Sequence, residues 1–406
     1  MKHDAPSAVV VGAGVIGSSV ANALAGRGWS VTVVEQYSPA HVRASSHDSS
    51  RVFRLAHGDE DPWGWYTRSA RRARELWLEI GAEEGVELLA ETGLVWFAHR
   101  ADGIEALSEI TLERQGLPFD RLPPEAAQEL FPEVELADLD FLLYEPHGGV
   151  LRANLCVHTL IQRAQRLGVA LVSGRALPVD GRASIEGRIL DADRTIWACG
   201  GWLGALFPEH ADVRPTRQTV FYLGAGPQWA TPGVPVWIDD DYDAYGLGDF
   251  DGAGFKAIRS KPAGDYLDPD LGSRLPDEAS ERRTRQYLGK RFPSLADAPI
   301  VSARVCQYEL TPDQHFLVAP LDDDARAWLI GGGSGHAFKH GPALGDYAAD
   351  LLEGHQQPRD EFRLGRRSPG REPDQPTLGV PVSVNSLEER GELTHCRQSP
   401  DQEERR

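Results

Sequence analysis

Three glycines near the start of the chain have the spacing of a dinucleotide-binding turn, Gly12-Ala13-Gly14-Val15-Ile16-Gly17. In such a turn the first glycine makes the tight bend, the second lets the backbone approach a pyrophosphate, and the third lets the helix pack against a strand. Glu35, 23 residues after the first glycine, is placed to accept hydrogen bonds from ribose hydroxyls. The pattern predicts dinucleotide binding and leaves open whether the dinucleotide is FAD or NAD.

The segments around the glycines predict a βαβ unit. Residues 8–11 are a β-branched run, residues 15–27 carry apolar side chains at helical spacing, and residues 30–35 read as a second strand. Further elements follow the same patterns. We expect helices over 63–80, 155–167 and 342–352, and strands over 94–97, 169–172, 195–198 and 328–330.

The order of these elements predicts an α/β fold with two interleaved domains. A Rossmann-like nucleotide-binding domain is expected from residues 1–62, 145–215 and 300–365. A β-rich (α+β) substrate domain is expected from residues 63–144 and 216–299, because the second of these segments is rich in aromatics and turn formers. Residues 366–406 have few large apolar side chains and are expected to be a disordered tail.

The bulk properties favour an enzyme with a small-molecule substrate. A chain of 406 residues that is 41% hydrophobic can bury one large core or two ordinary ones. The net charge of −19 argues against binding nucleic acid or an anionic membrane. The four cysteines show neither metal nor disulfide spacing, so we expect no metal and a reducing, cytoplasmic setting. We expect no signal peptide and no membrane span.

Four further segments narrow the choice of dinucleotide. They are residues 45–54 (SSHDSSRVFR), 245–256, 305–308 (VCQY) and 335–339 (GHAFK). Their order and spacing resemble the D-amino-acid-oxidase-like flavoproteins, specifically the branch of monomeric sarcosine oxidase and N-methyltryptophan oxidase. The likeness extends over most of residues 7–355. It implies FAD as the cofactor, and therefore a Rossmann-like FAD-binding domain.

The resemblance implies that the FAD is bound covalently. In that family a cysteine at the position of Cys306 carries the flavin through a thioether to its 8-methyl group. The chemistry is reasonable because a thiolate can add to the electron-poor edge of the ring. Taken alone, Cys306 would be interpreted as a buried structural thiol. Cys156, Cys199 and Cys396 are expected to be ordinary thiols.

The resemblance also implies a substrate site. Arg54 and Lys339 match the pair that grips the substrate carboxylate, the guanidinium with two parallel hydrogen bonds and the ammonium as a second charge. Lys256 matches the lysine that accelerates reaction of reduced flavin with oxygen, because a fixed positive charge favours superoxide. Tyr245 and Tyr308 match two active-site tyrosines. On local sequence alone these cations could be surface residues and these tyrosines core residues.

Further cofactor contacts are implied around the glycine turn and in the later segments. Besides residues 12–17, Glu35, Cys306 and Lys339, they are Gln36, Ser45, Ser46, His47, Arg51, Leu177 and Gly335. The chain also departs from the sarcosine oxidases. Ser260 replaces a histidine, Gly333 an aromatic residue and Ala337 a glycine. These changes put sarcosine itself in doubt as the substrate.

We therefore expect an FAD-dependent amine oxidase acting on a secondary or N-methyl amino acid. It would give an imine, hydrolysed to aldehyde and amine, and hydrogen peroxide. Oxidation of a cyclic imino acid of the pipecolate or piperideine-carboxylate type is an alternative, as is a dehydrogenase that uses another electron acceptor. A flavin-binding protein without turnover is also possible, but it would not need a carboxylate-binding pair. A monomer is expected.

Overall fold

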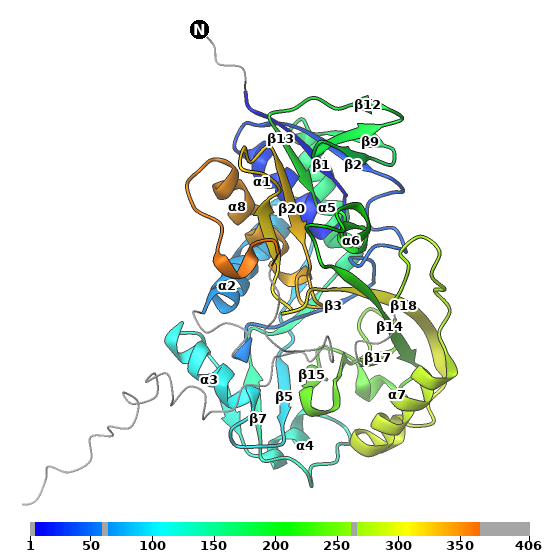
Figure 1. The fold of residues 1–406 in the computed structure, drawn as a ribbon. Coiled ribbons are helices and arrows are strands. Elements are labelled where there is room, and N and C mark those ends of the chain that lie inside the picture. Colours follow the sequence, from blue (N-terminus) through cyan, green and yellow to red (C-terminus); the bar gives the residue numbers. More distant parts are fainter. Residues whose placement is uncertain (1–4, 59–63, 261–265, 366–406) are drawn as a thin grey trace, which may run out of the picture.

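The computed structural model describes residues 5–58, 64–260 and 266–365. In Figure 1 these residues form an upper part built around one sheet and a lower part built around another. The chain passes between the two parts several times, so that segments distant in the sequence share a sheet. The tail predicted over 366–406 lies outside the described residues.

The upper sheet has six strands in the order β19-β20-β13-β1-β2-β9. All neighbours are parallel except β19 and β20. The predicted strands beside the glycine turn are confirmed as β1 and β2, with Val10 opposite Val33. The strand bounds are β1 Ser7–Val11, β2 Ser30–Glu35, β9 Ala170–Ser173, β13 Arg194–Trp197, β19 Leu317–Pro320 and β20 Ala327–Gly331.

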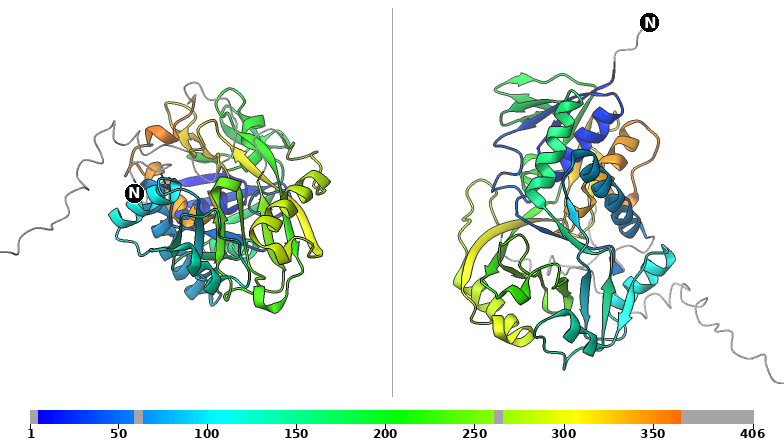
Figure 2. Two further views of the ribbon diagram at one scale, coloured as in Figure 1. Left: turned by 90° about the horizontal axis from the view of Figure 1, so that it is seen from below. Right: turned by 180° about the vertical axis from the view of Figure 1, so that it is seen from behind.

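Both faces of this sheet are covered. Alternate side chains of β1 point to opposite faces, and both sets are buried. Ala8 and Val10 join one buried cluster, and Val9 and Val11 join another. Four helices gather on the first face, as the rear view in Figure 2 shows. They are α1 Val15–Gly26, α2 Trp65–Glu84, α5 Ala153–Arg166 and α8 Gly341–Leu352. The second face carries α6 Leu203–Leu206 and the hairpins β10 Leu177–Val179, β11 Arg182–Ile185 and β12 Arg188–Ile189.

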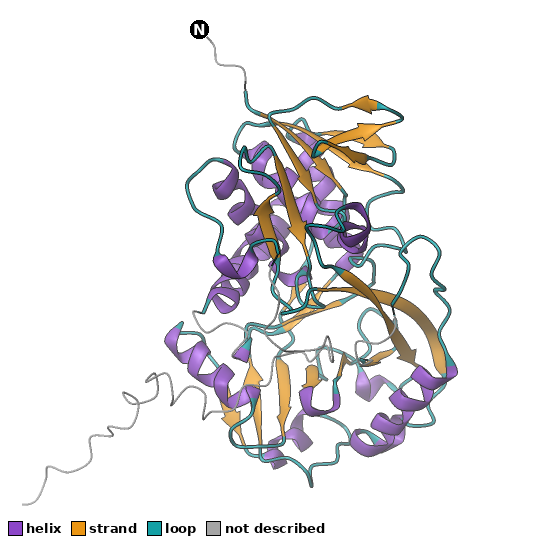
Figure 3. Cartoon of the chain, in the orientation of Figure 1, coloured by secondary structure: helices purple, strands orange, loops and turns teal. Residues whose placement is uncertain are grey.

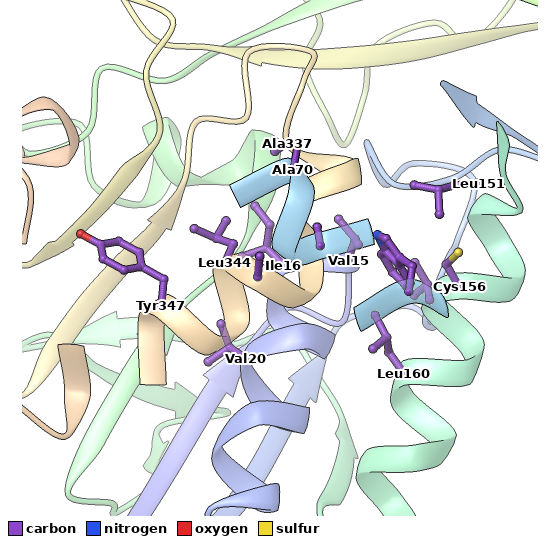
Figure 4. Close-up of a cluster of buried hydrophobic side chains, with 14 of the residues drawn as sticks. Val15, Ile16, Val20, Ala70, Leu151, Cys156, Leu160, Ala337, Leu344 and Tyr347 are labelled. Carbon is purple, nitrogen blue, oxygen red and sulfur yellow. The ribbon is translucent and has the colours of Figure 1, made fainter. Parts of the chain in front are cut away.

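Helix α1 lies at the centre of the helical layer. Figure 4 shows Val15, Ile16 and Val20 among side chains of the neighbouring helices. Gly345 of α8 allows a close approach, because a Cβ there would lie 2.6 Å from the carbonyl oxygen of Ser19. The same layer buries Cys156 completely. This packing fixes the N-terminus of α1, and with it the glycine turn.

The lower sheet has eight strands in the order β18-β14-β17-β16-β15-β5-β7-β6. It is antiparallel except for the β15–β5 pair. Figure 3 shows its strands in orange in the lower part of the molecule. The strand bounds are β5 Leu94–Ala98, β6 Asp120–Leu122, β7 Phe141–Glu145, β14 Arg214–Leu223, β15 Val236–Asp239, β16 Ala244–Leu247, β17 Phe255–Arg259 and β18 Ile300–Leu310.

One strand and one helix pack in the other part of the molecule from the one to which their residue ranges were expected to belong. Strand β18 lies in the lower sheet, although residues 300–365 were assigned to the nucleotide-binding segments, because it pairs along its length with β14. Helix α2 packs on α8 of the upper part, although residues 63–144 were assigned to the substrate segments. The aromatic-rich stretch 216–299 also contains a helix, α7 Glu278–Arg291. The domain boundaries themselves remain a prediction.

A three-stranded sheet, β3 Arg51–Phe53, β8 Gly149–Leu151 and β4 Leu89–Ala90, lies where the two parts meet. In the part of the chain that the structure describes, the remaining α-helices are α3 Ile104–Arg114 and α4 Ala127–Leu130. Among the described residues, no helix combines the length and apolar character that crossing a membrane requires.

Candidate active site

A long cavity follows the junction of the two parts. Its empty space is about 1690 Å³, which includes its open mouth. One end is lined by the β1–α1 turn, the end of β2 and the residues after β13, and the other by strands β14, β16, β17 and β18. The cavity therefore lies at the carboxyl ends of parallel strands, where α/β sheets bind ligands.

Two glycines of the turn at one end leave no room for a side chain. Gly12 has a φ of +105°, and a Cβ there would lie 2.4 Å from the carbonyl oxygen of Ala198. A Cβ on Gly17 would lie 2.0 Å from the carbonyl oxygen of Gly12. Gly14 lines the cavity and is the N-cap of α1, without a capping side chain. The first turn of α1 holds no acidic residue. This arrangement fits a pyrophosphate at the helix N-terminus.

Glu35 lies beside the turn at the end of β2. Its Oε2 accepts a hydrogen bond from the Ala13 amide at 2.8 Å, and its Oε1 accepts one from the Tyr37 amide at 2.9 Å. A carboxylate has about four acceptor sites, so both oxygens can accept further bonds. Glu35 and Gln36 also line the cavity. This end therefore fits the adenosine half of a dinucleotide.

The loop before β3 forms the next stretch of wall. Ser46 Oγ accepts from the Val15 amide at 3.0 Å. Arg51 Nη2 donates to the carbonyl oxygens of Ser45 and His47, at 2.8 and 2.9 Å. Ser45, Ser46 and Arg51 line the cavity, whereas His47 is turned to the carbonyl of Ala40, with its Nδ1 2.8 Å from that oxygen. The loop is thus tied both to the glycine turn and to Arg51.

Asp48 is the centre of this loop, and no role was predicted for it. Its side chain is completely buried. Lys256 Nζ lies 2.9 Å and Arg51 Nη1 2.7 Å from its Oδ2, and Arg304 Nη1 lies 3.0 Å from its Oδ1. Tyr222 donates to Oδ1 at 2.5 Å. One carboxylate therefore gathers three cations from three strands at the cavity wall.

The charges in this cluster support one another. Burial alone would raise the pKa of Asp48, but Lys256, followed by Arg51 and Arg304, brings it well below its ordinary value. Burial alone would lower the pKa of Lys256, but Asp48 outweighs it and the net shift is upward. Both groups are therefore ionised at neutral pH.

The two predicted tyrosines meet across the other end of the cavity. The hydroxyl oxygens of Tyr245 on β16 and Tyr308 on β18 are 2.5 Å apart. Burial is the main cause that raises the pKa of both phenols, so both are neutral at ordinary pH. Ser260 also interacts with Tyr308, where the sarcosine oxidases carry a histidine. Gly335 packs against the Tyr308 ring, since a Cβ there would lie 2.9 Å from it.

Cys306 lines the same part of the cavity. It lies on β18 opposite Gln218 of β14. Burial raises the pKa of its thiol, and the charge of Asp48 adds to this, whereas Arg51, Lys256 and Arg304 lower it. The net shift is upward, so it is the position of the thiol on the cavity wall, and not a lowered pKa, that fits attachment to a bound group.

Arg54 and Lys339 are both buried and both line the cavity. The guanidinium of Arg54 donates to the carbonyl oxygen of Ala56 and lies 5.1 Å from the ring of Trp96. Lys339 Nζ donates to the carbonyl oxygen of His336 at 2.9 Å, and the Lys339 carbonyl accepts from Trp77 of α2 at 2.9 Å. Arg54 already lies near one buried carboxylate, that of Glu145, because burial raises the pKa of this group and the charge of Arg54 opposes the rise. A carboxylate bound in the cavity could interact with both cations as well.

A cluster of three buried histidines lies beside this pair. His57, His336 and His340 each offer a ring nitrogen within 4.8 Å of the others. Burial and the charge of Lys339 hold the pKa of each histidine well below its ordinary value. The same positive charge would repel a metal ion. The three imidazoles are therefore neutral at ordinary pH.

Two further observations concern the nucleotide end. Leu177 is 52% exposed on β10 and is not among the described residues that line the cavity, whereas its neighbour Ala176 is. Asp270 was not predicted, yet its Oδ1 accepts from Tyr37 and Trp202, each at 3.0 Å. Arg43 donates to the backbone of the same segment. Residues 266–275 are thus fastened beside the cavity mouth by contacts that no local sequence pattern signals.

Comparisons with known proteins agree with this geometry. Residues 7–351 match the family described as FAD dependent oxidoreductase. An N-methyl-L-tryptophan oxidase from Yersinia pestis (strain Pestoides F) is 25% identical over 373 residues, which cover 88% of this chain and 98% of that protein.

Solved structures share the fold. An L-proline dehydrogenase from P. horikoshii has a TM-score of 0.74 at 20% identity, covering 87% of this chain and 94% of that one. NikD, an amino acid oxidase of nikkomycin biosynthesis, has a TM-score of 0.71 at 21% identity, covering 87% and 96%. The glycine turn, the buried Glu35 and a profile match over nearly all described residues lead to one conclusion: the chain belongs to the family of FAD dependent oxidoreductases.

Proposed function

We propose that the protein is an FAD-dependent oxidase of a secondary or N-methyl amino acid. The observation that carries the proposal is that Arg54 and Lys339, two buried cations, line the same cavity as the glycine turn. A protein that only stored or carried a flavin would have no use for a carboxylate-binding pair. The name of the N-methyl-L-tryptophan oxidase, one of the relatives found by sequence, points to the same substrate class.

The nucleotide half of the FAD would be held by Gly12, Gly14 and Glu35, and Arg51 and Cys306 would serve the flavin end. When bound, the flavin would accept a hydride equivalent from the carbon beside the substrate nitrogen, which leaves an imine. The protein's own contribution is orientation. Arg54 and Lys339 would fix the carboxylate and thereby the position of the reacting carbon.

The amine would be received by the two tyrosines. Because the raised pKa values keep Tyr245 and Tyr308 protonated, they act as hydrogen-bond partners and not as bases. We propose that the substrate reacts with its nitrogen neutral. Lys256 would stay charged and would stabilise superoxide as oxygen takes electrons from the reduced flavin.

A cyclic imino acid is the second candidate substrate. Gly333 replaces the aromatic residue of the sarcosine oxidases, and a Cβ there would already lie 2.8 Å from the Cβ of Ala337. The turn is close-packed without an aromatic ring, which changes the shape of the substrate end. A dehydrogenase using another acceptor would have the same binding residues. We also propose that the protein works as a monomer in the cytoplasm.

The deciding experiment is an anaerobic panel of N-methyl, cyclic and primary amino acids in both enantiomers. Bleaching of the flavin absorbance identifies a substrate without assuming the acceptor. Admission of oxygen then tests for hydrogen peroxide in an amount equal to the substrate oxidised. If no member of the panel bleaches the flavin, amine oxidation is refuted. Bleaching without peroxide would indicate a dehydrogenase.

We further propose that Cys306 binds the flavin covalently. Formation of the thioether releases two protons, one from the thiol and one from the methyl group, and two electrons, which oxygen takes up. After acid precipitation the yellow colour should remain with the wild-type protein, whereas Cys306→Ser should release free FAD. Cys199→Ser, at another thiol on the cavity wall, is the matched control and should retain the colour. A colourless wild-type pellet would refute the bond and leave the substrate proposal standing.

A further inference from the structure

Lys256 is held almost entirely by one short segment of loop. Its ammonium group donates to Asp48 Oδ2 at 2.9 Å, to the Ser50 carbonyl oxygen at 2.8 Å and to Ser50 Oγ at 3.1 Å. The lysine is on β17 and the acceptors lie about 200 residues earlier in the chain. Lys256 is only 2% exposed, so these contacts replace nearly all of its solvation.

Asp48 is the only one of these acceptors with a charge. An ammonium held by neutral acceptors in such a buried position would tend to lose its proton, because burial penalises the charged form. Other groups near Lys256 contribute less than Asp48. Tyr222, whose ring centroid lies 5.5 Å from Nζ, also raises the pKa of Lys256, but by less than Asp48, and it donates its own proton to Asp48. Arg51 repels the ammonium.

We propose that Asp48 is the positioning residue for Lys256: its carboxylate fixes the ammonium at the cavity wall, keeps it charged, and so sets the rate at which reduced flavin reacts with oxygen. This inference rests on the proposed function, because it assumes that oxygen is the acceptor. Reoxidation passes two electrons and two protons to oxygen and gives hydrogen peroxide. The charged lysine favours the first electron transfer, which forms the superoxide anion.

The charge arrangement gives the expected direction of change. Asp48 is the main cause that raises the pKa of Lys256, while burial and Arg51 lower it. Arg304 and Cys306 also face the carboxylate, from β18. Replacing Asp48 by asparagine keeps the size of the side chain and removes its charge. The pKa of Lys256 should then fall, so that the lysine loses its proton at a lower pH.

The test is reoxidation of flavin that has been reduced photochemically, which requires no knowledge of the substrate. Rates would be followed from about pH 6 to about pH 10. Above the pKa of Lys256, each further unit of pH lowers the charged fraction of this lysine about tenfold. In Lys256→Met the flavin should reoxidise slowly at every pH, and the rate should not fall further as the pH rises. Asp48→Asn should be close to wild type near pH 6. Towards pH 10 its rate should fall, whereas wild type, in which the pKa of Lys256 is raised, should keep its rate.

A double variant keeps the test decisive if the single variant does not fold. Asp48→Asn leaves the cations uncompensated, whereas Asp48→Asn with Lys256→Met removes a positive and a negative charge together. Because Asp48 acts through Lys256, the double variant should reoxidise at the rate of Lys256→Met alone. The proposal would be contradicted if the double variant reoxidised at least several-fold more slowly or more quickly than Lys256→Met.

The control is Asp239→Asn, at another fully buried carboxylate, which interacts with Arg291 at 3.1 Å and lies outside the cavity lining. It should lower thermal stability and leave the pH profile of reoxidation unchanged. If wild type fails to react with oxygen, the proposed oxidase function falls and this inference with it. If wild type reacts, Lys256→Met is slow and Asp48→Asn keeps the wild-type profile, only the role of Asp48 is refuted.

Discussion

Lys339 is a single residue on which substrate affinity should depend. Its ammonium lies in a buried turn that lines the cavity, where a substrate carboxylate could bind it. A hydrogen bond to a charged group contributes about 1.5–3 kcal/mol. Lys339→Met should therefore raise KM for the best substrate of the panel by roughly 10- to 100-fold, with a smaller effect on kcat. Steady-state kinetics would measure the change in KM and the change in kcat separately.

The control for this prediction is Lys290→Met on α7. The Lys290 side chain is 44% exposed and contacts Asp138, away from the cavity. Its kinetic constants should match those of wild type. An unchanged KM in Lys339→Met would show that the carboxylate is held elsewhere.

The limits of sequence reasoning are also clearest at single residues. Glu35 could be predicted, because its distance from Gly12 follows from the length of one βαβ unit. Asp48 could not be given a role, because its partners Lys256 and Arg304 reach it only after β14, β17 and β18 have paired. A serine-rich loop with one aspartate reads as an ordinary turn. Its burial and its charge partners are properties of the tertiary structure.

Individual elements were predicted well where a local pattern sets them. Strands β1 and β2 and helices α1, α5 and α8 were expected close to their observed bounds. The strands show as short β-branched runs and the helices as apolar residues at helical spacing. Helix α7 was missed because it is highly polar and lies in an aromatic-rich stretch. It is capped by the Asp277 carboxylate, which accepts from the Ser280 amide at 2.8 Å. That cap is a sequence signal that could have found it.

The β1–α1 turn is the element on which cofactor binding should depend most. Gly12→Ala places a methyl group 2.4 Å from the Ala198 carbonyl oxygen at a φ of +105° that alanine rarely adopts. The turn must shift, so we expect flavin content to fall by at least about half. The ratio of flavin to protein absorbance, measured on purified protein, would show this.

Gly26→Ala provides the matched control at the other end of α1. A Cβ there would meet nothing within 4 Å, and its φ lies outside the left-handed region. Alanine inside a helix is more stable than glycine by about 0.5–1 kcal/mol. The variant should therefore keep full flavin content and unfold at a slightly higher temperature. Full flavin content in Gly12→Ala would show that the turn tolerates a shift.

The whole molecule should lose stability in mild acid because it buries neutral histidines. His57, His336 and His340 each have a pKa well below the ordinary value of 6.5, caused by burial first and by Lys339 second. Below pH 6.5 the unfolded chain binds protons at these positions and the folded chain does not. The free energy of unfolding therefore falls as pH falls through 6.5. Each such histidine contributes a slope of about 1.4 kcal/mol per pH unit.

His340→Phe tests this linkage, because phenylalanine fills a buried ring position without a titrating group. His340 is completely buried between α2 and the cavity wall, with its Nδ1 3.0 Å from Ser69 Oγ. The variant should be less stable at pH 7, yet its denaturant-derived free energy of unfolding should depend less steeply on pH between about 5 and 6.5, by about 1.4 kcal/mol per unit. His158→Phe, at an exposed position of α5, should keep the wild-type slope. An equal slope in His340→Phe and wild type would mean that the buried imidazole takes up a proton in the folded protein, and that Lys339 does not keep it neutral.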